Sequence, residues 1–127
     1  MALLFFWGLA RVPMAQAVAL TFIAPLIALA LAAALLDELL APDDTGEPSA
    51  LARRMGIMYV IWDDTMYASY DGFEPKRYLS SGCRNRRTCS PTLRHRDHLH
   101  ISLTRRGARG LTSWYAAQAA LGVVPAT

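Results

Sequence analysis

Residues 12–36 form an apolar run without a charged side chain, and this run limits what the chain can fold into more than any other feature. As a helix it would be about 37 Å long at roughly 1.5 Å per residue, against a hydrocarbon core of roughly 30 Å. We therefore expect a membrane-spanning helix over about residues 15–36, in which Pro25 is tolerated. The alternative is a signal peptide cleaved near residues 32–34, although signal peptides have shorter apolar segments with basic residues ahead of them.

The charges that flank the apolar run favour one orientation in a membrane. Arg11 precedes the run, whereas residues 37–47 hold five acids and no base. Because lysine and arginine stay on the cytoplasmic side, we expect the N-terminus inside and the remainder outside. Arg53 and Arg54 follow closely enough to weaken this argument. The expectation is a membrane-associated protein with an extracellular C-terminal domain, or a secreted protein if the run is a signal.

The remainder of the chain is small and basic. Residues 53–109 carry twelve of the thirteen basic residues and only five acids, so the net charge of +3 describes neither half of the chain. About 85 residues remain outside the membrane, which is near the lower limit for an independent hydrophobic core.

Turn residues divide this basic part into short elements. Prolines and a glycine indicate a linker, Ser49 is the expected N-cap of a helix over residues 50–55, and Gly56 is its expected stop. The β-branched and aromatic run 57–62 predicts a buried strand. The elements expected after it are a turn at Asp63-Asp64, a returning strand over 65–69, a turn over 70–75, an irregular basic segment over 76–96, and a terminal helix over 114–121 that is capped by Thr112 or Ser113 and ended by Gly122.

Cys83 and Cys89 enclose a short arginine-rich loop. Two cysteines this close predict a local disulfide if the segment is exported. The alternative is a pair of metal-ligand thiols, which is less favoured because zinc-ligand cysteines are usually two to four residues apart.

All three histidines lie in the segment RHRDHLHISL, residues 94–103. Its second half alternates, and successive side chains of a strand point to opposite faces. We expect the apolar face to pack on a core and the imidazoles to face a cleft or solvent. The two faces hold His98, His100 and Ser102 on one side, and Leu99, Ile101 and Leu103 on the other.

The same segment has a pattern that suits hydrolysis at zinc. Such a site needs a few ligands, an open coordination position and a base for the bound water. His100 would be an imidazole ligand, Asp97 the base, and His98 a partner of the bound water or of the developing oxyanion. The spacing D-x-x-H is short and common by chance, so a solvated polar strand is the alternative.

The N-terminal part resembles a known family of membrane proteins. LLFFWGLARVPMAQAVALTFIAPLIALALAAALLDE is similar to a helix–loop–helix of EamA-type drug/metabolite transporters, with an aromatic run, an R-x-P turn at 11–13, a P-L step at 25–26 and an acidic exit at 37–38. A transporter surrounds a midplane site with many helices. One and a half helices form no such path, so transport by this chain alone is not expected.

The C-terminal part resembles a family of enzymes. GIMYVIWDDTMYASY, a cysteine-flanked loop and TLRHRDHLHISL are together similar to the C-terminal half of D-alanyl-D-alanine carboxypeptidase-like (LAS-type) zinc peptidases, in particular to the secreted actinobacterial cell-wall branch. In that family a G-x-x-Y-V/I-I-W strand precedes a closing H-x-D-H-V/L-H-I/V-S strand. The likeness covers about residues 39–115. It implies an α+β fold with a small antiparallel sheet, zinc, and action on peptidoglycan peptides that contain D-alanine.

This second resemblance assigns roles to three residues. His100 matches the final zinc ligand, Asp97 the acid–base carboxylate, and His98 the first histidine of the H-x-H pair. His95 has no firm match and is expected to be a supporting or surface histidine. The family's two other ligands, a His and an Asp spaced H-x6-D, precede the tyrosine-tryptophan strand. This chain has the transporter-like segment there instead.

We therefore interpret the chain as a composite. A transporter-like helical segment (1–38) and a linker (39–48) precede a truncated peptidase-like domain (49–127), and the fold class is α+β: a transmembrane-type helix, then a small antiparallel sheet with short flanking helices. The expected function is that of a remnant of a zinc-dependent D,D-peptidase-like cell-wall hydrolase, inactive alone because upstream ligands are missing. Asp63 or Asp64 would be the available substitutes, but nothing in the sequence directs them at His100.

Two other functions compete with this interpretation. In one, the chain is a non-enzymatic membrane protein fragment whose basic domain is an interaction module. In the other, the arginine-rich stretch 84–109 binds nucleic acid or phosphate, which requires a scaffold that orders the basic surface. Arginine-rich loops are usually solvated, so nucleic acid is not expected as a partner. The expected partners are a peptidoglycan peptide, by resemblance, and a membrane, through residues 12–36.

Overall fold

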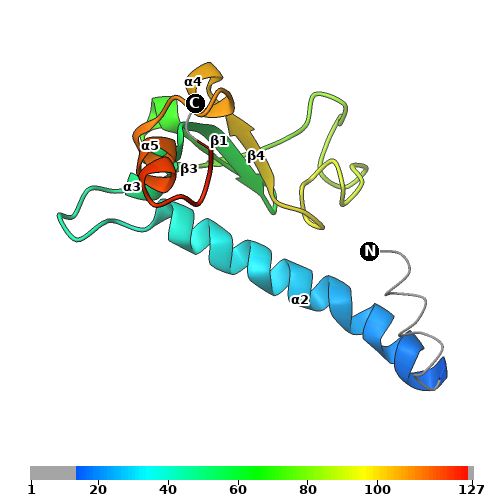
Figure 1. Ribbon diagram of the computed structural model, residues 1–127. Coiled ribbons are helices and arrows are strands. Elements are labelled where there is room, and N and C mark those ends of the chain that lie inside the picture. The colour runs from blue at the N-terminus through cyan, green and yellow to red at the C-terminus, as the bar shows by residue number, and fades with distance from the viewer. Residues whose placement is uncertain (1–13, 126–127) are drawn as a thin grey trace. The chain divides into compact units, whose positions relative to one another are not determined.

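The computed structural model describes residues 14–125, which combine helices with one four-stranded antiparallel sheet (Figure 1). The predicted α+β class is confirmed. The aromatic run and the R-x-P turn of the transporter-like segment lie outside the described residues. The chain divides into two compact units, up to Ala33 and from Ala34, and each is treated separately. In chain order, the elements are α2 (Met14–Leu40), α3 (Ala50–Met55), β1 (Ile57–Trp62), β2 (Thr65–Ala68), the 3-10 helix η1 (Ser69–Asp71), β3 (Pro75–Arg77), β4 (His100–Leu103), α4 (Arg105–Ala108) and α5 (Ser113–Ala120).

Helix α2 carries no charged side chain from Met14 to Leu36. Seven large hydrophobic side chains between Val18 and Leu35 are exposed, and Pro25 lies inside the helix without ending it. The window Thr21–Leu40 has a mean hydropathy of 2.1, so this helix is long and apolar enough to cross a membrane, as a signal sequence would also be. A helix of this kind needs an apolar environment on every side. The predicted apolar helix is therefore confirmed.

The last turn of α2 belongs to the compact unit that begins at Ala34. Leu36 (6% exposed) and Leu39 (1% exposed) are part of the hydrophobic core on the sheet. Residues 39 and 40, which were predicted to begin the linker, are the last two residues of α2, and the two compact units divide between Ala33 and Ala34. The apolar run and the core-facing leucines are continuous in sequence, so composition alone does not locate this boundary.

Strands β1 and β2 form a tight hairpin. Trp62 pairs with Thr65, so only Asp63 and Asp64 form the loop, as predicted. Both aspartates have positive φ, 41° and 64°. Two-residue hairpin loops favour this conformation at both positions because it matches the twist of the strands, and aspartate tolerates it better than most residues.

The strand β3 was not predicted, because residues 76–96 were expected to be irregular. Its three residues are exposed and pair with β2, with Tyr67 opposite Pro75. Proline is acceptable as the first residue of an edge strand, where its missing N–H costs no ladder bond. The strand forms through this pairing rather than through a hydrophobic pattern of its own.

The sheet has the order β3-β2-β1-β4, so β4 is an edge strand. Val60, which is fully buried, lies opposite Ile101, so both belong to the face that carries the core. Leu99 packs against this core, but Ile101 (39% exposed) and Leu103 (36%) do not. The prediction of a packed apolar face is wrong for these two residues, because no further strand continues the sheet beside β4 within residues 14–125.

Helix α3 has the predicted bounds, but its N-terminus differs. Ser49 has φ 53° and its side chain makes no capping bond, so the predicted cap is wrong. Gly56 ends the helix as predicted, with φ 74°, and its N–H donates to the carbonyls of Ala52 and Arg53. A C-terminal glycine in the left-handed region satisfies carbonyls that the helix leaves open.

The C-terminal helices complete this unit. Helix α5 confirms the predicted terminal helix to within one residue at each end, although Thr112 at its N-cap makes no side-chain bond. Helix α4 was not predicted; Thr104 is its N-cap, and the Thr104 hydroxyl oxygen accepts the N–H of Gly107. Helix α5 packs against α3.

Candidate functional site

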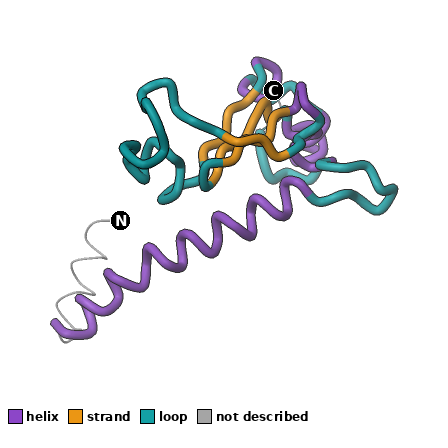
Figure 2. Tube along the Cα trace, turned by 180° about the vertical axis from the view of Figure 1, so that it is seen from behind, coloured by secondary structure: helices purple, strands orange, loops and turns teal. Residues whose placement is uncertain are grey.

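The long loop between β3 and β4 brings the three histidines together. This loop is drawn in teal in Figure 2, next to the strands. The ring centroid of His95 lies 4.8 Å from that of His98 and 5.2 Å from that of His100. Tyr78, at the start of the loop, has its ring centroid 5.1 Å from that of His95, with the two rings close to perpendicular. His95 is therefore the centre of the cluster.

The backbone of His95 is fixed to the β1–β2 hairpin. Its carbonyl accepts the N–H of Asp63 at 2.8 Å, and its own N–H donates to the Thr92 carbonyl at 3.0 Å. The residue has φ 52°, a conformation that is uncommon for a non-glycine residue and that here turns the chain back toward β4. These backbone bonds fix the position of His95 next to the hairpin loop.

The His95 side chain is buried, so of the two expected alternatives, a supporting or a surface histidine, the surface histidine is wrong. It is 9% exposed, and its Nδ1 has no hydrogen-bond partner in the part of the chain that the structure describes. Burial lowers the pKa of His95 below the ordinary histidine value, and the nearby His98 and His100 rings lower it further. The imidazole is therefore neutral at pH 7. Its central position depends on tertiary folding, and the only sequence signal for it is its place in the H-x-x-H-x-H run.

Asp97 and His98 form a hydrogen-bonded pair at the entrance to β4. Asp97 Oδ1 lies 2.7 Å from His98 Nδ1, and a carboxylate only accepts hydrogen bonds, so Nδ1 carries the proton. The Thr92 hydroxyl donates to Asp97 Oδ2 at 2.7 Å. This hydroxyl, followed by His98, holds the pKa of Asp97 below its usual range. Asp97 is thus an ionised, oriented carboxylate at neutral pH.

His100 lies on β4, on the face opposite the core. Its ring stacks on Tyr59 of β1, with centroids 5.8 Å apart and planes 4° from parallel. Its Nε2 lies 3.0 Å from the hydroxyl oxygen of Ser102. The predicted sharing of one strand face by His100 and Ser102 is confirmed, because Ile61 and Tyr59 are their register partners on β1.

The two aspartates of the hairpin form ion pairs with arginines. Arg94 forms a forked ion pair with Asp64, with Nε donating to Oδ1 at 2.9 Å, and Arg86 lies nearby with Nε 3.8 Å from the same oxygen. Arg96 donates to Asp63 at 2.9 Å. The hydrogen bond from Arg94 holds the pKa of Asp64 below its usual range. Neither carboxylate is directed at His100, so the substitution considered from the sequence is not realised.

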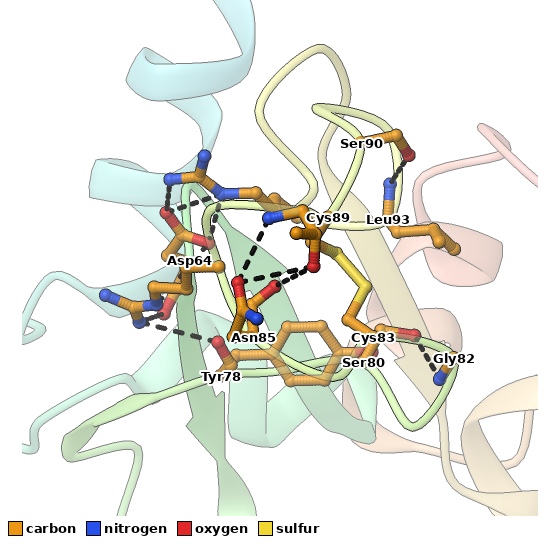
Figure 3. The surroundings of a disulfide bond; sticks show 12 residues. Asp64, Tyr78, Ser80, Gly82, Cys83, Asn85, Cys89, Ser90 and Leu93 are labelled. Carbon is orange, nitrogen blue, oxygen red and sulfur yellow. Dashed lines mark hydrogen bonds and ion pairs between the residues drawn. A yellow bond between two sulfur atoms is a disulfide. The ribbon is translucent and has the colours of Figure 1, made fainter.

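The cysteines form the predicted disulfide, Cys83–Cys89 (Figure 3). Bonded sulfurs are not metal-ligand thiolates, so the alternative of a thiol metal site is wrong. The disulfide closes a loop of five residues between the two cysteines and lies within the same long connection that carries His95.

The described residues do not supply a complete zinc site. A catalytic zinc ion usually has three protein ligands and an open position. No group of three His, Cys, Asp or Glu side chains within residues 14–125 is arranged to hold a metal ion. His95 offers one unpartnered nitrogen, while Asp97 occupies His98 Nδ1 and Ser102 faces His100 Nε2. The arrangement provides a hydrogen-bonded carboxylate–imidazole pair and one imidazole on a strand.

Comparison with protein-family models, with curated proteins and with solved structures finds no match for this chain. The interpretation of the site therefore depends on its residues: the Asp97–His98 pair, the His100 imidazole and the buried His95 beside them.

Proposed function

We propose that the unit from Ala34 onward is an incomplete zinc-peptidase-like domain of the D,D-carboxypeptidase type, without hydrolytic activity on its own. The observation that carries this proposal is the grouping of Asp97, His98 and His100 around one strand entrance. Asp97 is oriented and ionised, as a general base must be. His100 stands on a rigid strand and is stacked on Tyr59, which suits a ligand whose ring must keep one orientation.

The edge position of β4 supports the proposal of an incomplete domain, because among residues 14–125 only β1 pairs with this strand. His100 lies on that edge strand, and the exposed Ile101 and Leu103 beside it are apolar positions that a further segment would cover. An edge strand presents unpaired backbone groups to which another strand can add. Additional ligands would have to reach His100 from a segment at this edge, because Asp63 and Asp64 are held by arginines.

Zinc titration of the full chain in a nonionic detergent tests this proposal. We expect weak, substoichiometric zinc binding that falls further in His100→Ala, and no cleavage of peptides that end in D-alanyl-D-alanine. Ser102→Ala is the matched control, because it leaves the imidazole in place and removes only the hydroxyl that faces Nε2.

Two outcomes contradict the proposal in different ways. Stoichiometric zinc binding with peptide cleavage, both lost in His100→Ala, means that the site is complete. Equal zinc binding by the parent chain and His100→Ala means that His100 is not a ligand and removes the basis of the peptidase assignment.

Helix α2 anchors this unit in a membrane, with the basic residues on the extracellular side. Its exposed apolar surface supports the anchor, and the Cys83–Cys89 disulfide supports an oxidising compartment. Trypsin added to intact cells should then cut after arginines of the basic loop, and cells lysed before digestion are the control. Protection until lysis contradicts this orientation, and a shortened chain in the medium indicates a cleaved signal.

A second candidate function is a non-enzymatic, membrane-attached interaction domain. Residues 75–96 hold seven basic residues and no acid, which is the observation that favours it. On this reading the histidine cluster only packs the loop onto the sheet. Unchanged zinc behaviour in His100→Ala, combined with an intact fold, supports this second function.

A further inference from the structure

A pocket of about 380 Å³ lies where β3 continues into the disulfide-closed loop. Three of its lining residues are arginines, and none is an acid. The histidine cluster does not contribute to it. The residues that line it are Arg77, Tyr78, Leu79, Arg84, Asn85 and Arg86.

One of the three guanidinium groups is fixed in place. Arg86 donates through Nη2 to the backbone carbonyl of Asp64 at 3.0 Å and to that of Tyr78 at 3.4 Å (Figure 3). Its side chain is also near the Asp64 carboxylate, which Arg94 already binds through a fork. The negative charge of Asp64 is therefore shared by two arginines.

The other two arginines have no such compensation. Arg77 and Arg84 are exposed, and neither makes an ion pair with any acid among residues 14–125. The surrounding segment, residues 75–96, contains no aspartate or glutamate. Because like charges gathered at one concave surface raise the local positive potential, this pocket attracts anions.

The loop that carries Arg84 is braced in several ways. Cys83 and Cys89 close it covalently, and Asn85 Oδ1 accepts both the N–H and the hydroxyl of Thr88, at 3.1 and 3.2 Å. At its base, the Tyr78 N–H donates to the Asp64 carbonyl at 2.7 Å. A site held in shape before binding loses less conformational entropy when a ligand arrives.

We propose that this pocket binds a phosphoryl group as its dianion. Two uncompensated guanidinium groups match a charge of about −2, which a phosphate monoester carries at pH 7 and a carboxylate does not. Guanidinium groups bind phosphate oxygens through paired donors. The pocket volume of about 380 Å³ falls in the range of small-ligand sites, roughly 300–1,000 Å³. The site is independent of zinc and of the proposed peptidase function.

The test measures phosphate binding to the full chain in nonionic detergent by calorimetry at low salt. Inorganic phosphate is the first ligand, and phenyl phosphate is the second. Arg84→Ala removes a pocket arginine. Arg87→Ala removes the same charge from the same loop without touching the pocket lining. We expect Arg84→Ala to weaken phosphate binding roughly tenfold, because a charged hydrogen-bond pair is lost, and Arg87→Ala to change it less than about twofold. Stronger binding of phenyl phosphate than of inorganic phosphate indicates an ester as the natural ligand, and the reverse indicates free phosphate.

Further variants keep the proposal falsifiable. Arg84→Lys retains the charge but not the paired donors, so it should bind with intermediate affinity and shows that any loss is not caused by misfolding. A chelator should leave phosphate binding unchanged, which separates this site from the histidine cluster. No phosphate binding by the parent chain, equal weakening in Arg84→Ala and Arg87→Ala, or displacement of phosphate by equimolar acetate overturns the proposal.

Discussion

The backbones of Gly56 and Gly107 touch where α3 ends and α4 packs beside it. A Cβ atom on Gly107 would lie 2.6 Å from the Gly56 carbonyl oxygen, and one on Gly56 would lie 2.9 Å from Gly107 Cα. The same Gly56 oxygen accepts the N–H of Thr104 at 2.8 Å. This contact joins the start of β1 to the end of β4, so the edge strand depends on two residues without side chains.

We expect Gly107→Ala to lower the free energy of unfolding by about 1–3 kcal/mol, because an added methyl group meets backbone atoms that cannot move aside. Urea denaturation of the full chain in detergent, monitored by tryptophan fluorescence, measures this free energy. Gly82→Ala is the control, since its Cβ would meet only ordinary contacts at 3.8 Å or more. Equal stability of the two variants contradicts the close contact.

The Asp64–Arg94 pair should make the fold sensitive to acid. Arg94 holds the pKa of Asp64 below its ordinary value of 3.8, so the pair stabilises the folded state at neutral pH. This contribution is fully present above about pH 3.8 and is lost as the pH falls through the lower, folded-state pKa. Between pH 7 and pH 2, the melting temperature of Asp64→Asn should fall less than that of the parent chain. Asp44→Asn changes an exposed linker position, so its melting temperature should fall with pH as much as that of the parent chain.

Much of the sheet was predictable from local sequence. The β-branched run of β1 and the aspartate pair after it led to the observed hairpin, because strand and turn preferences agree there. Strand β3 was missed, since Pro75, Lys76 and Arg77 have no apolar pattern and form a strand only by pairing with β2. Local preferences do not report such pairing.

The candidate site was predictable only in part. Asp97, His98 and His100 are close in sequence, so their proximity in space follows from one strand and its entrance. The central position of His95 was missed, because it requires a positive φ and backbone bonds to a hairpin more than thirty residues earlier. The exposure of Ile101 was missed for a related reason: alternation shows which residues share a face, but not whether an edge strand is covered.

Reduction of the Cys83–Cys89 disulfide should affect the phosphate pocket more than the fold as a whole. A cross-link over so short a loop stabilises by about 2 kcal/mol in the chain-entropy account. We expect the chain to remain folded in dithiothreitol while phosphate binding weakens several-fold, because Arg84 loses its fixed position. Calorimetry with and without reductant measures both effects. The double variant Cys83→Ser/Cys89→Ser should match the reduced parent and be insensitive to reductant, and tight phosphate binding by it contradicts the role of the cross-link.

The last prediction concerns the leucines that α2 contributes to the core. Leu39 is 1% exposed and packs in the same cluster as Ile57 and Val60, so Leu39→Ala should lower the free energy of unfolding by about 2–4 kcal/mol. Leu35, one turn earlier, is 46% exposed, and Leu35→Ala should change it by less than about 0.5 kcal/mol.

The same measurement, urea denaturation in detergent, applies to both leucine variants. A chain shortened to residues 41–127 lacks Leu36 and Leu39. It should therefore unfold at a lower urea concentration than a chain that starts at Ala34. Equal stability of the two shortened chains would mean that the last turn of α2 belongs with the apolar run, as the sequence suggested, and not with the core.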